Sequence, residues 1–425
     1  MMRSLLLAGL AALALAAPAL AQTIAITGAK VIADPRGAPI ENGVVVMRDG
    51  KILSVGGAQT AIPAGAERID ASGRWVTTGI IAAFSRAGLV EIAAEDSAND
   101  TRAAEAKNGA ALDAFYAFDP ASVALPVTRI EGVTRIAVAP AAADDIFAGY
   151  GLIADTSGAA NSVTARRAFV YAELGEGGAS RAGGSRPALW ARLLTALEEA
   201  DRYPQGYDGP EGDALLRLDA KALQPVARGQ VPLVAQVHRA ADIRLLIDLK
   251  RQRPALKLIL TGASEAWMVA SELAAAKIPV LVDPIQNLPE SFEQRGATLD
   301  QALRLAKAGA PFAIAHAPGS DDEFQTRLVL QIAGNAVANG LSWGEAFAAI
   351  TSSPAAIFGL PNHGQLAPGK AADVVIWDGD PLEVMTAPIA VYIDGKPTSM
   401  TTRQTKLRDR YHPTKAGDQA VGYRF

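Results

Sequence analysis

The sequence contains no cysteine. Disulfides, thiolate metal ligands and cysteine nucleophiles are therefore excluded, and the fold must be held by its core alone. Aromatic residues make up only 6% of the chain, and the formal net charge is −4. A chain with few stacking side chains and no positive field is a poor binder of nucleic acid or anionic lipid. We therefore expect a small molecule or another protein as its partner, and no nucleic acid.

Long apolar runs are absent except at the N-terminus. Residues 5–17 form an unbroken apolar stretch after Arg3, and Ala19 and Ala21 supply the small side chains that a signal peptidase reads. This pattern predicts a signal peptide over residues 1–21, cleavage before Gln22 and a periplasmic location. The alternative is a membrane anchor, but the run is shorter than the roughly 20 apolar residues that a span needs. We expect no membrane anchor once the signal peptide is removed.

Both ends of the remaining chain have a β pattern. Segments 44–47 and 52–55 flank Asp49 and Gly50, a pair suited to positive φ in a tight hairpin turn. A matching strand pattern returns at 372–377 and 390–393. Each end is too small to bury a core alone. We therefore predict one small β-sandwich domain built from residues 22–77 and 364–397.

The middle of the chain alternates apolar strands with amphipathic helices. Strands are predicted at 231–237, 256–260, 280–282 and 312–315, followed by helices at 240–253, 265–276, 299–308 and 324–339. Repeated β-α units give parallel strands with right-handed crossovers. We favour an α/β fold with a (β/α)8 TIM-like barrel over residues 78–363, and a doubly wound sheet is the alternative. The Gly-rich segment 175–184 is predicted to be a mobile loop, and residues 398–425 a loosely ordered tail.

Six segments of the chain have a recognisable wording, in a recognisable order. They are 29–32 (AKVI), 43–46 (GVVV), 49–52 (DGKI), 70–77 (DASGRWVT), 349–355 (AITSSPA) and 364–373 (GQLAPGKAAD). These segments resemble the amidohydrolase superfamily, and in particular its exported, imidazolonepropionase-like members. This resemblance implies a (β/α)8 barrel that carries a small β-domain made from both termini.

The resemblance also implies a chemistry. The family hydrolyses C–N and related bonds with one or two divalent metals, because a bound Zn²⁺ lowers the pKa of water to near 7. The family's ligands are His-x-His on the first barrel strand, a Lys or Glu on the fourth, one His each on the fifth and sixth, and an Asp on the eighth. Two histidines at i and i+2 of a strand point to the same side and reach one metal.

The first-strand motif of the family resembles Pro-Gly-x-Ile-Asp-x-His-x-His, and residues 78–86 (TGIIAAFSR) align with it. Ala82 replaces the Asp, Phe84 the first His and Arg86 the second. Neither Phe nor Arg has a lone pair to give to a metal, and a guanidinium repels a cation. The following segment 88–92 still resembles the family, so the motif is substituted rather than shifted. The sequence therefore predicts a degenerate metal site.

Two of the four histidines remain as candidate ligands. His238 ends the predicted strand 231–237 and matches the fifth-strand ligand, although a hydrogen-bonded histidine at a strand end is the alternative. His316 stands where the eighth-strand Asp is expected, with Asp321 and Asp322 after it. No histidine occurs at 260–263, where the sixth-strand ligand is expected. The other two histidines, His363 and His412, are predicted to lie on the surface.

Three hypotheses follow. In the first, the chain is a degenerate amidohydrolase that uses its barrel to bind a ligand or a partner. In the second, it is an active hydrolase in which His238 and His316 hold a single divalent metal such as zinc. In the third, it is a non-catalytic subunit of a larger exported complex, paired with an intact paralogue. As to assembly, both a homo-oligomer and a hetero-oligomer with a paralogue are compatible with the sequence.

Overall fold

The computed structural model of the chain describes residues 23–316, 318 and 322–412. The predicted signal peptide lies outside these residues and stays a prediction. Within the described ranges, no helix is long and apolar enough to cross a membrane.

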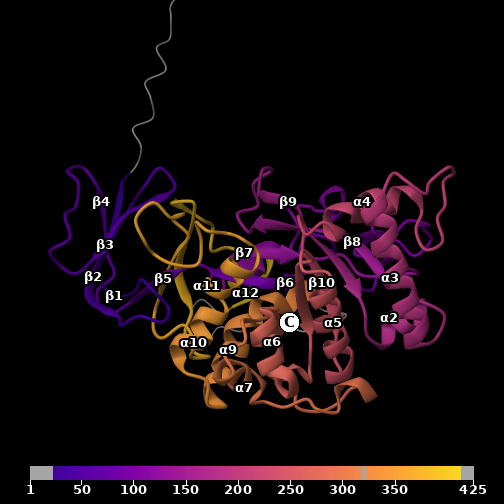
Figure 1. Cartoon of the computed structure of the whole chain (residues 1–425). Coiled ribbons are helices and arrows are strands. Elements are labelled where there is room, and N and C mark those ends of the chain that lie inside the picture. The colour runs from indigo at the N-terminus through magenta and orange to yellow at the C-terminus, as the bar shows by residue number, and fades with distance from the viewer. Residues whose placement is uncertain (1–22, 317, 319–321, 413–425) are drawn as a thin grey trace, which may run out of the picture.

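The first five and the last three strands form one small β-domain, at the left of Figure 1. Its hairpin turn is the one that the sequence predicts, since Asp49 and Gly50 have φ values of +54° and +76°. The sheet curls back on itself, because Lys51 pairs with Ala371 and both edges share one apolar core. Its strands are β1 (Ile24–Ile32), β2 (Ile40–Arg48), β3 (Lys51–Gly56), β4 (Glu67–Asp70), β5 (Trp75–Thr78), β14 (Val374–Trp377), β15 (Pro388–Ile393) and β16 (Lys396–Pro397).

The other eight strands form the predicted barrel. They pair in sequence order, and β6 and β13 at the two ends of that order pack together, so the sheet is nearly closed. One strand departs from a (β/α)8 pattern, since β8 runs antiparallel to both β7 and β9. The strands are β6 (Ile80–Ser85), β7 (Val133–Val138), β8 (Phe147–Asp155), β9 (Val163–Glu173), β10 (Leu233–Val237), β11 (Leu258–Gly262), β12 (Val280–Val282) and β13 (Phe312–Ile314).

Helices cover the outside of the barrel. Figure 1 shows α5, α6 and α7 around the parallel strands, and α3 and α4 on the side away from the β-domain. The helices are α1 (Ala124–Arg129), α2 (Glu176–Arg181), α3 (Arg186–Arg202), α4 (Arg217–Ala227), α5 (Ala240–Gln252), α6 (Ala270–Ala276), α7 (Gln301–Lys307), α8 (Asp322–Gln325), α9 (Val329–Ala338), α10 (Trp343–Ala349), α11 (Ser352–Ile357) and α12 (Arg403–Tyr411). Short 3-10 turns are η1 (Asp96–Ala98), η2 (Ala114–Tyr116), η3 (Ala266–Val269), η4 (Phe292–Gln294) and η5 (Thr326–Leu328).

Two predicted loops are in part helical. The Gly-rich segment 175–184 contains α2, and Arg181 of this helix donates hydrogen bonds to the carbonyl oxygens of Ala142 and Ala143. The tail contains α12, which a capping box at Thr402 starts. Long-range contacts of Arg181 hold α2 in place, whereas a local capping box starts α12, and composition alone indicates neither helix. Residues 413–425 lie outside the described part of the chain.

Two apolar layers separate the inside of the barrel from its outside. Leu233, Ala235 and Val237 of β10 pack in the outer layer with helix residues, whereas Val234 faces the interior. The interior cluster holds side chains from every barrel strand and is as closed as the core of a TIM barrel. Its strand members are Ala83, Phe84, Ala137, Ala148, Ile153, Phe169, Tyr171, Val234, Ile259, Leu281 and Ala313.

Candidate functional site

The candidate site lies where the parallel barrel strands end, because the family that the sequence resembles carries its metal ligands there. In sheet order, β6 is the first barrel strand, β9 the fourth, β10 the fifth, β11 the sixth and β13 the eighth. These are the strands on which the sequence places its ligand positions. The side chains at their carboxyl ends therefore decide what the site can do.

The first-strand positions are occupied by apolar packing. Phe84 is 3% exposed and joins the interior cluster, with its ring centroid 5.6 Å from that of Tyr171. Ala82 is buried in the outer layer. The Arg86 guanidinium carbon lies 5.7 Å from the Phe84 ring centroid. The strand thus supplies an aromatic ring and a cation where the family has two imidazoles.

Ser85, between these two positions, is also buried. Its hydroxyl shares a 2.7 Å hydrogen bond with that of Thr326 and accepts a 3.0 Å bond from the Ala87 amide. Both contacts are local anchors of the strand end. Neither of these two partners is a histidine, so within the described part of the chain they give Ser85 no base that would make it a nucleophile.

His238 follows β10, as the sequence predicts, and is 4% exposed. Its Nδ1 shares a 2.9 Å hydrogen bond with the Ser264 hydroxyl. The ring lies over the backbone of Gly262, and a Cβ added to that glycine would fall 2.6 Å from Cε1 and 3.0 Å from Nε2 of His238. The imidazole therefore occupies the space that a side chain at the end of the sixth strand would fill.

Burial lowers the pKa of His238 to about 4. The side chain is then neutral in the folded protein at pH 5–6, where an unfolded histidine with a pKa near 6.5 is largely protonated. Since the folded pKa is the lower one, His238 costs the folded state stability as the pH falls from about 6.5 toward 4. We expect ¹⁵N NMR of the His238 ring to show a neutral imidazole at pH 5.5. A ring that titrates near 6.5, the ordinary value for histidine, would contradict the buried position.

His316 follows β13, and β11 and β12 separate that strand from β10 in the sheet. Asp321 and the side chain of Asp322 lie outside the described residues. Within residues 23–316, 318 and 322–412, no group of three or more His, Asp and Glu side chains is arranged to hold a metal ion. The assignment of His238 and His316 as ligands therefore stays a prediction.

Sequence reasoning missed two acidic residues at the strand ends. Glu173 ends β9, the fourth barrel strand, and forms an ion pair with Arg181 of α2 at 2.5 Å. Asp283 follows β12, is 4% exposed and accepts a 3.2 Å hydrogen bond from the Ile285 amide. The apolar run before Glu173 was the signal that could have identified the strand and hence its final carboxylate.

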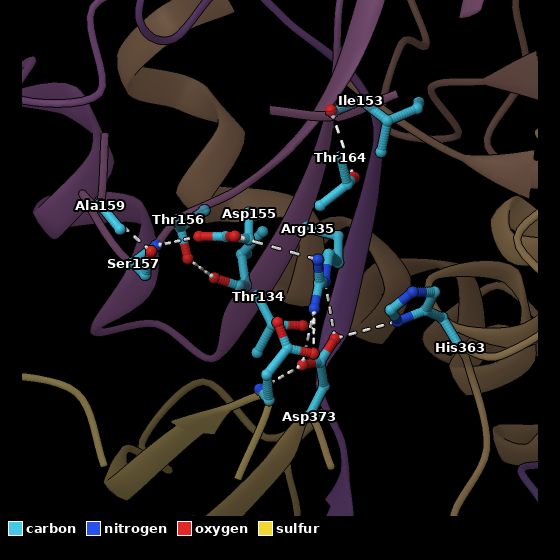
Figure 2. Close-up of polar contacts among 12 residues, drawn as sticks. Thr134, Arg135, Ile153, Asp155, Thr156, Ser157, Ala159, Thr164, His363 and Asp373 are labelled. Atoms are coloured by element: carbon cyan, nitrogen blue, oxygen red, sulfur yellow. Dashed lines mark hydrogen bonds and ion pairs between the residues drawn. The ribbon is translucent and has the colours of Figure 1, made fainter. Parts of the chain in front are cut away.

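A second polar cluster lies at the junction of barrel and β-domain (Figure 2). Arg135 of β7 is 2% exposed and binds both carboxylate oxygens of Asp373, at 2.8 and 3.1 Å. It also donates to Asp394 at 2.8 Å and lies 4.0 Å from Asp155. His363 contributes Nδ1, 3.2 Å from Asp373. The His363 side chain is 17% exposed, so this residue lies at the edge of the buried network rather than fully on the surface, where the sequence places it.

The charged groups in this cluster stabilise each other's ionised forms. Burial disfavours the Asp373 carboxylate, but the hydrogen bond from His363 and the nearby Arg135 hold its pKa well below the usual range. Burial likewise disfavours the Arg135 cation, and Asp373 outweighs that effect and raises its pKa. The network joins the second barrel strand to β14, and we interpret it as a domain junction rather than a reaction centre.

Comparisons with known sequences agree with the fold. A model of the amidohydrolase family matches residues 334–399. The chain is 24% identical to amidohydrolase tasK of Hapsidospora irregularis, and the match covers 84% of this chain and 39% of that protein. It is 26% identical to an imidazolonepropionase of Cupriavidus pinatubonensis, covering 88% and 91% of the two chains. The chain therefore spans well under half the length of tasK and nearly all of the imidazolonepropionase.

Comparisons with solved structures also agree with the fold. An amidohydrolase from Thermotoga maritima superposes with a TM-score of 0.78 at 23% identity, covering 88% of this chain and 99% of that one. Molinate hydrolase superposes with a TM-score of 0.55 at 17% identity, with coverages of 89% and 95%. At these identities the superpositions establish the fold alone. The family match over residues 334–399 and the two sequence relatives support the resemblance to the amidohydrolase superfamily that the sequence predicts, and the superpositions show that the chain has its fold.

Proposed function

We propose that the protein is a degenerate amidohydrolase, exported to the periplasm, that has an accessory or ligand-binding role in place of hydrolysis. The observation that carries this proposal is the position of His238. Its Nδ1 is engaged by Ser264, and its ring lies over Gly262 at the end of the strand that should supply the next ligand.

The donors among the described residues do not fit a divalent metal. A catalytic zinc takes three protein ligands and keeps a fourth position for water. Here the first strand offers Phe84 and Arg86, and the sixth offers Gly262. An ion that entered beside Arg86 would meet a like charge. The family's chemistry, in which a metal supplies the hydroxide, has no support from these side chains.

The competing hypothesis is an active hydrolase with one metal on His238 and His316. The two hypotheses are distinguished by assaying the purified chain for hydrolysis of a panel of cyclic amides and amidines with added zinc or manganese. We expect no turnover above the uncatalysed rate and no difference between the wild type and His238→Ala. Turnover that His238→Ala abolishes, while the matched variant of the exposed His412 (His412→Ala) retains it, would establish the active hydrolase instead.

A second candidate function is a non-catalytic subunit of a larger assembly. The tasK relative favours it, because the match covers only 39% of that protein and leaves room for a further unit of this size in one polypeptide. Native mass spectrometry of the complex isolated from its own cells should then show this chain with an intact amidohydrolase. A monomer that co-purifies with no partner would count against this role.

Export is tested separately. We expect the mature chain to begin at Gln22, because Ala19 and Ala21 stand at the positions that a signal peptidase reads. Intact-mass measurement of the protein from a periplasmic fraction checks this cleavage. Full-length chain in the cytoplasm would contradict it.

A further inference from the structure

Two consecutive arginines of β9 converge on one carboxylate oxygen. Arg166 donates to Asp113 Oδ2 at 3.0 and 2.9 Å, and Arg167 donates to the same oxygen at 2.8 Å. Neighbouring side chains on a strand normally point to opposite faces. Arg167 breaks this alternation because its φ is +54° and the pairing of β8 with β9 is irregular around Ile153. Strained backbone of this kind is common at functional sites.

The charges at this point do not balance. Asp113 is 3% exposed, and although burial disfavours its charge, hydrogen bonds from Arg167 and Arg166 keep its pKa low. One carboxylate therefore faces two guanidinium groups. Arg167 is 53% exposed, and its Nε makes its single hydrogen bond within the described residues. The two terminal nitrogens of that guanidinium form the planar fork that binds a carboxylate with two hydrogen bonds.

Aromatic rings hold both guanidinium groups in place. The Arg166 carbon lies 4.4 Å from the Phe115 ring centroid and 4.6 Å from that of Tyr116, and the Arg167 carbon lies 5.1 Å from that of Tyr150. Stacked cations lose less freedom when a ligand binds. Tyr116 itself is 79% exposed. Arg, Tyr and Phe are the residue types that are enriched in protein interfaces.

We propose that Arg166 and Arg167, with Tyr116, form a docking site for an acidic segment of a partner protein. Arg166, Arg167 and Tyr116 are all exposed, which suits a polypeptide segment better than a small molecule, because small-molecule sites bury most of their ligand. The site lies in the first half of β9, whereas His238 follows the far end of the parallel neighbour β10. Docking here rests on the proposed accessory role and does not involve His238 or the strand end that it follows.

Binding of a defined acidic peptide tests the proposal. Fluorescence anisotropy with a labelled (Glu-Ala)4 peptide at low salt should show binding to the wild type. Arg167→Gln should weaken that binding about tenfold, because a charge-assisted bidentate contact is lost. Arg167→Lys should weaken it similarly, since lysine keeps the charge but lacks the fork. Arg166 still holds Asp113 in both variants, so unchanged melting temperatures are expected to confirm that they fold.

Arg403→Gln on the exposed helix α12 is the matched control, because it removes the same charge far from β9 along the chain. It should leave the affinity within about twofold. The proposal would be overturned if Arg403→Gln and Arg167→Gln lost the same peptide affinity, or if Arg167→Lys bound the peptide as tightly as the wild type. Displacement of the peptide by millimolar inorganic phosphate would overturn it too, since that would make this a site for small anions. None of these outcomes bears on metal content or hydrolysis, which test the proposed function independently.

Discussion

Replacing Arg135 by methionine is expected to lower the free energy of unfolding by about 3–5 kcal/mol, the cost of leaving a buried charge without its partner. Asp373 is 3% exposed and would lose both hydrogen bonds from the guanidinium. The methionine keeps the apolar stem, so the loss reports on charge rather than on packing. Urea unfolding at neutral pH, followed by circular dichroism, measures this difference.

The pH dependence of this effect has a defined sign. The wild-type Asp373 has a lowered pKa, so its contribution is present above the unfolded value near 3.9 and is lost as the pH falls through the lower folded value. In Arg135→Met the buried carboxylate of Asp373 becomes neutral when it is protonated, so the cost of its unpaired charge disappears at low pH. The difference in the free energy of unfolding between the wild type and Arg135→Met should therefore become smaller below about pH 4. A difference that stays constant down to pH 3 would show that the unpaired charge of Asp373 does not cause the loss of stability.

Arg36 provides the matched control for this variant. It also binds a carboxylate through two nitrogens, at 2.9 and 3.0 Å from Glu345, and it also joins the β-domain side to the barrel helices. Its side chain is 47% exposed, however. Arg36→Met should therefore cost less than about 1 kcal/mol, as exposed ion pairs do. Equal losses at the two positions would contradict the claim that burial makes the Arg135 network strong.

Phe84→Ala is expected to lower the free energy of unfolding by about 3–5 kcal/mol, the range for removal of a large buried aromatic side chain. The ring is 3% exposed and packs against Tyr171 inside the barrel. In an open metal site, this position would line a solvated cleft, and truncation would cost little. Chemical denaturation of the two proteins therefore distinguishes a closed interior from an open mouth.

Phe84→Leu is the control for volume and polarity. It retains an apolar side chain and should recover more than half of the loss, since volume-conserving changes in a core are tolerated best. A loss below about 1 kcal/mol in Phe84→Ala would show that the first-strand position is not part of the core. That result would weaken the argument that apolar packing has replaced the metal site.

The parts of the fold that could be predicted are those with a local signal. Asp49 and Gly50 predict a hairpin turn because few other residue pairs accept positive φ at both positions. The strand at 280–282 is bounded by its own apolar run and was predicted with the bounds that β12 has. The barrel followed from repetition of such units together with the resemblance of both termini to the family.

The β8–β9 hairpin could not be predicted in the same way. Its strands are irregularly paired, and Arg166 and Arg167 interrupt the alternation by which a strand is recognised. Glu173 was missed for this reason, because it was never assigned to a strand end. The reversal of β8 depends on contacts with β7 and β9, which a single sequence does not display.

The candidate site also has features that the sequence predicts and features that only the structure shows. That Phe84 and Arg86 cannot bind a metal follows from their chemistry alone. That the His238 ring turns over Gly262 depends on packing between two strands. The half-buried His363 contacts Asp373, which Arg135, far away in the sequence, also binds. Residue identity thus predicted the loss of the ordinary two-metal site, whereas the positions of His238 and His363 could be seen only in the structure.

The zinc content of the purified protein tests the central claim most directly. The chain should be expressed with its signal peptide in zinc-supplemented medium, and its metal should be measured by mass spectrometry beside His238→Ala and His412→Ala. The account predicts well below one zinc per chain in all three proteins, because the described side chains offer no set of three ligands. One equivalent of zinc in the wild type and in His412→Ala, lost in His238→Ala, would contradict it.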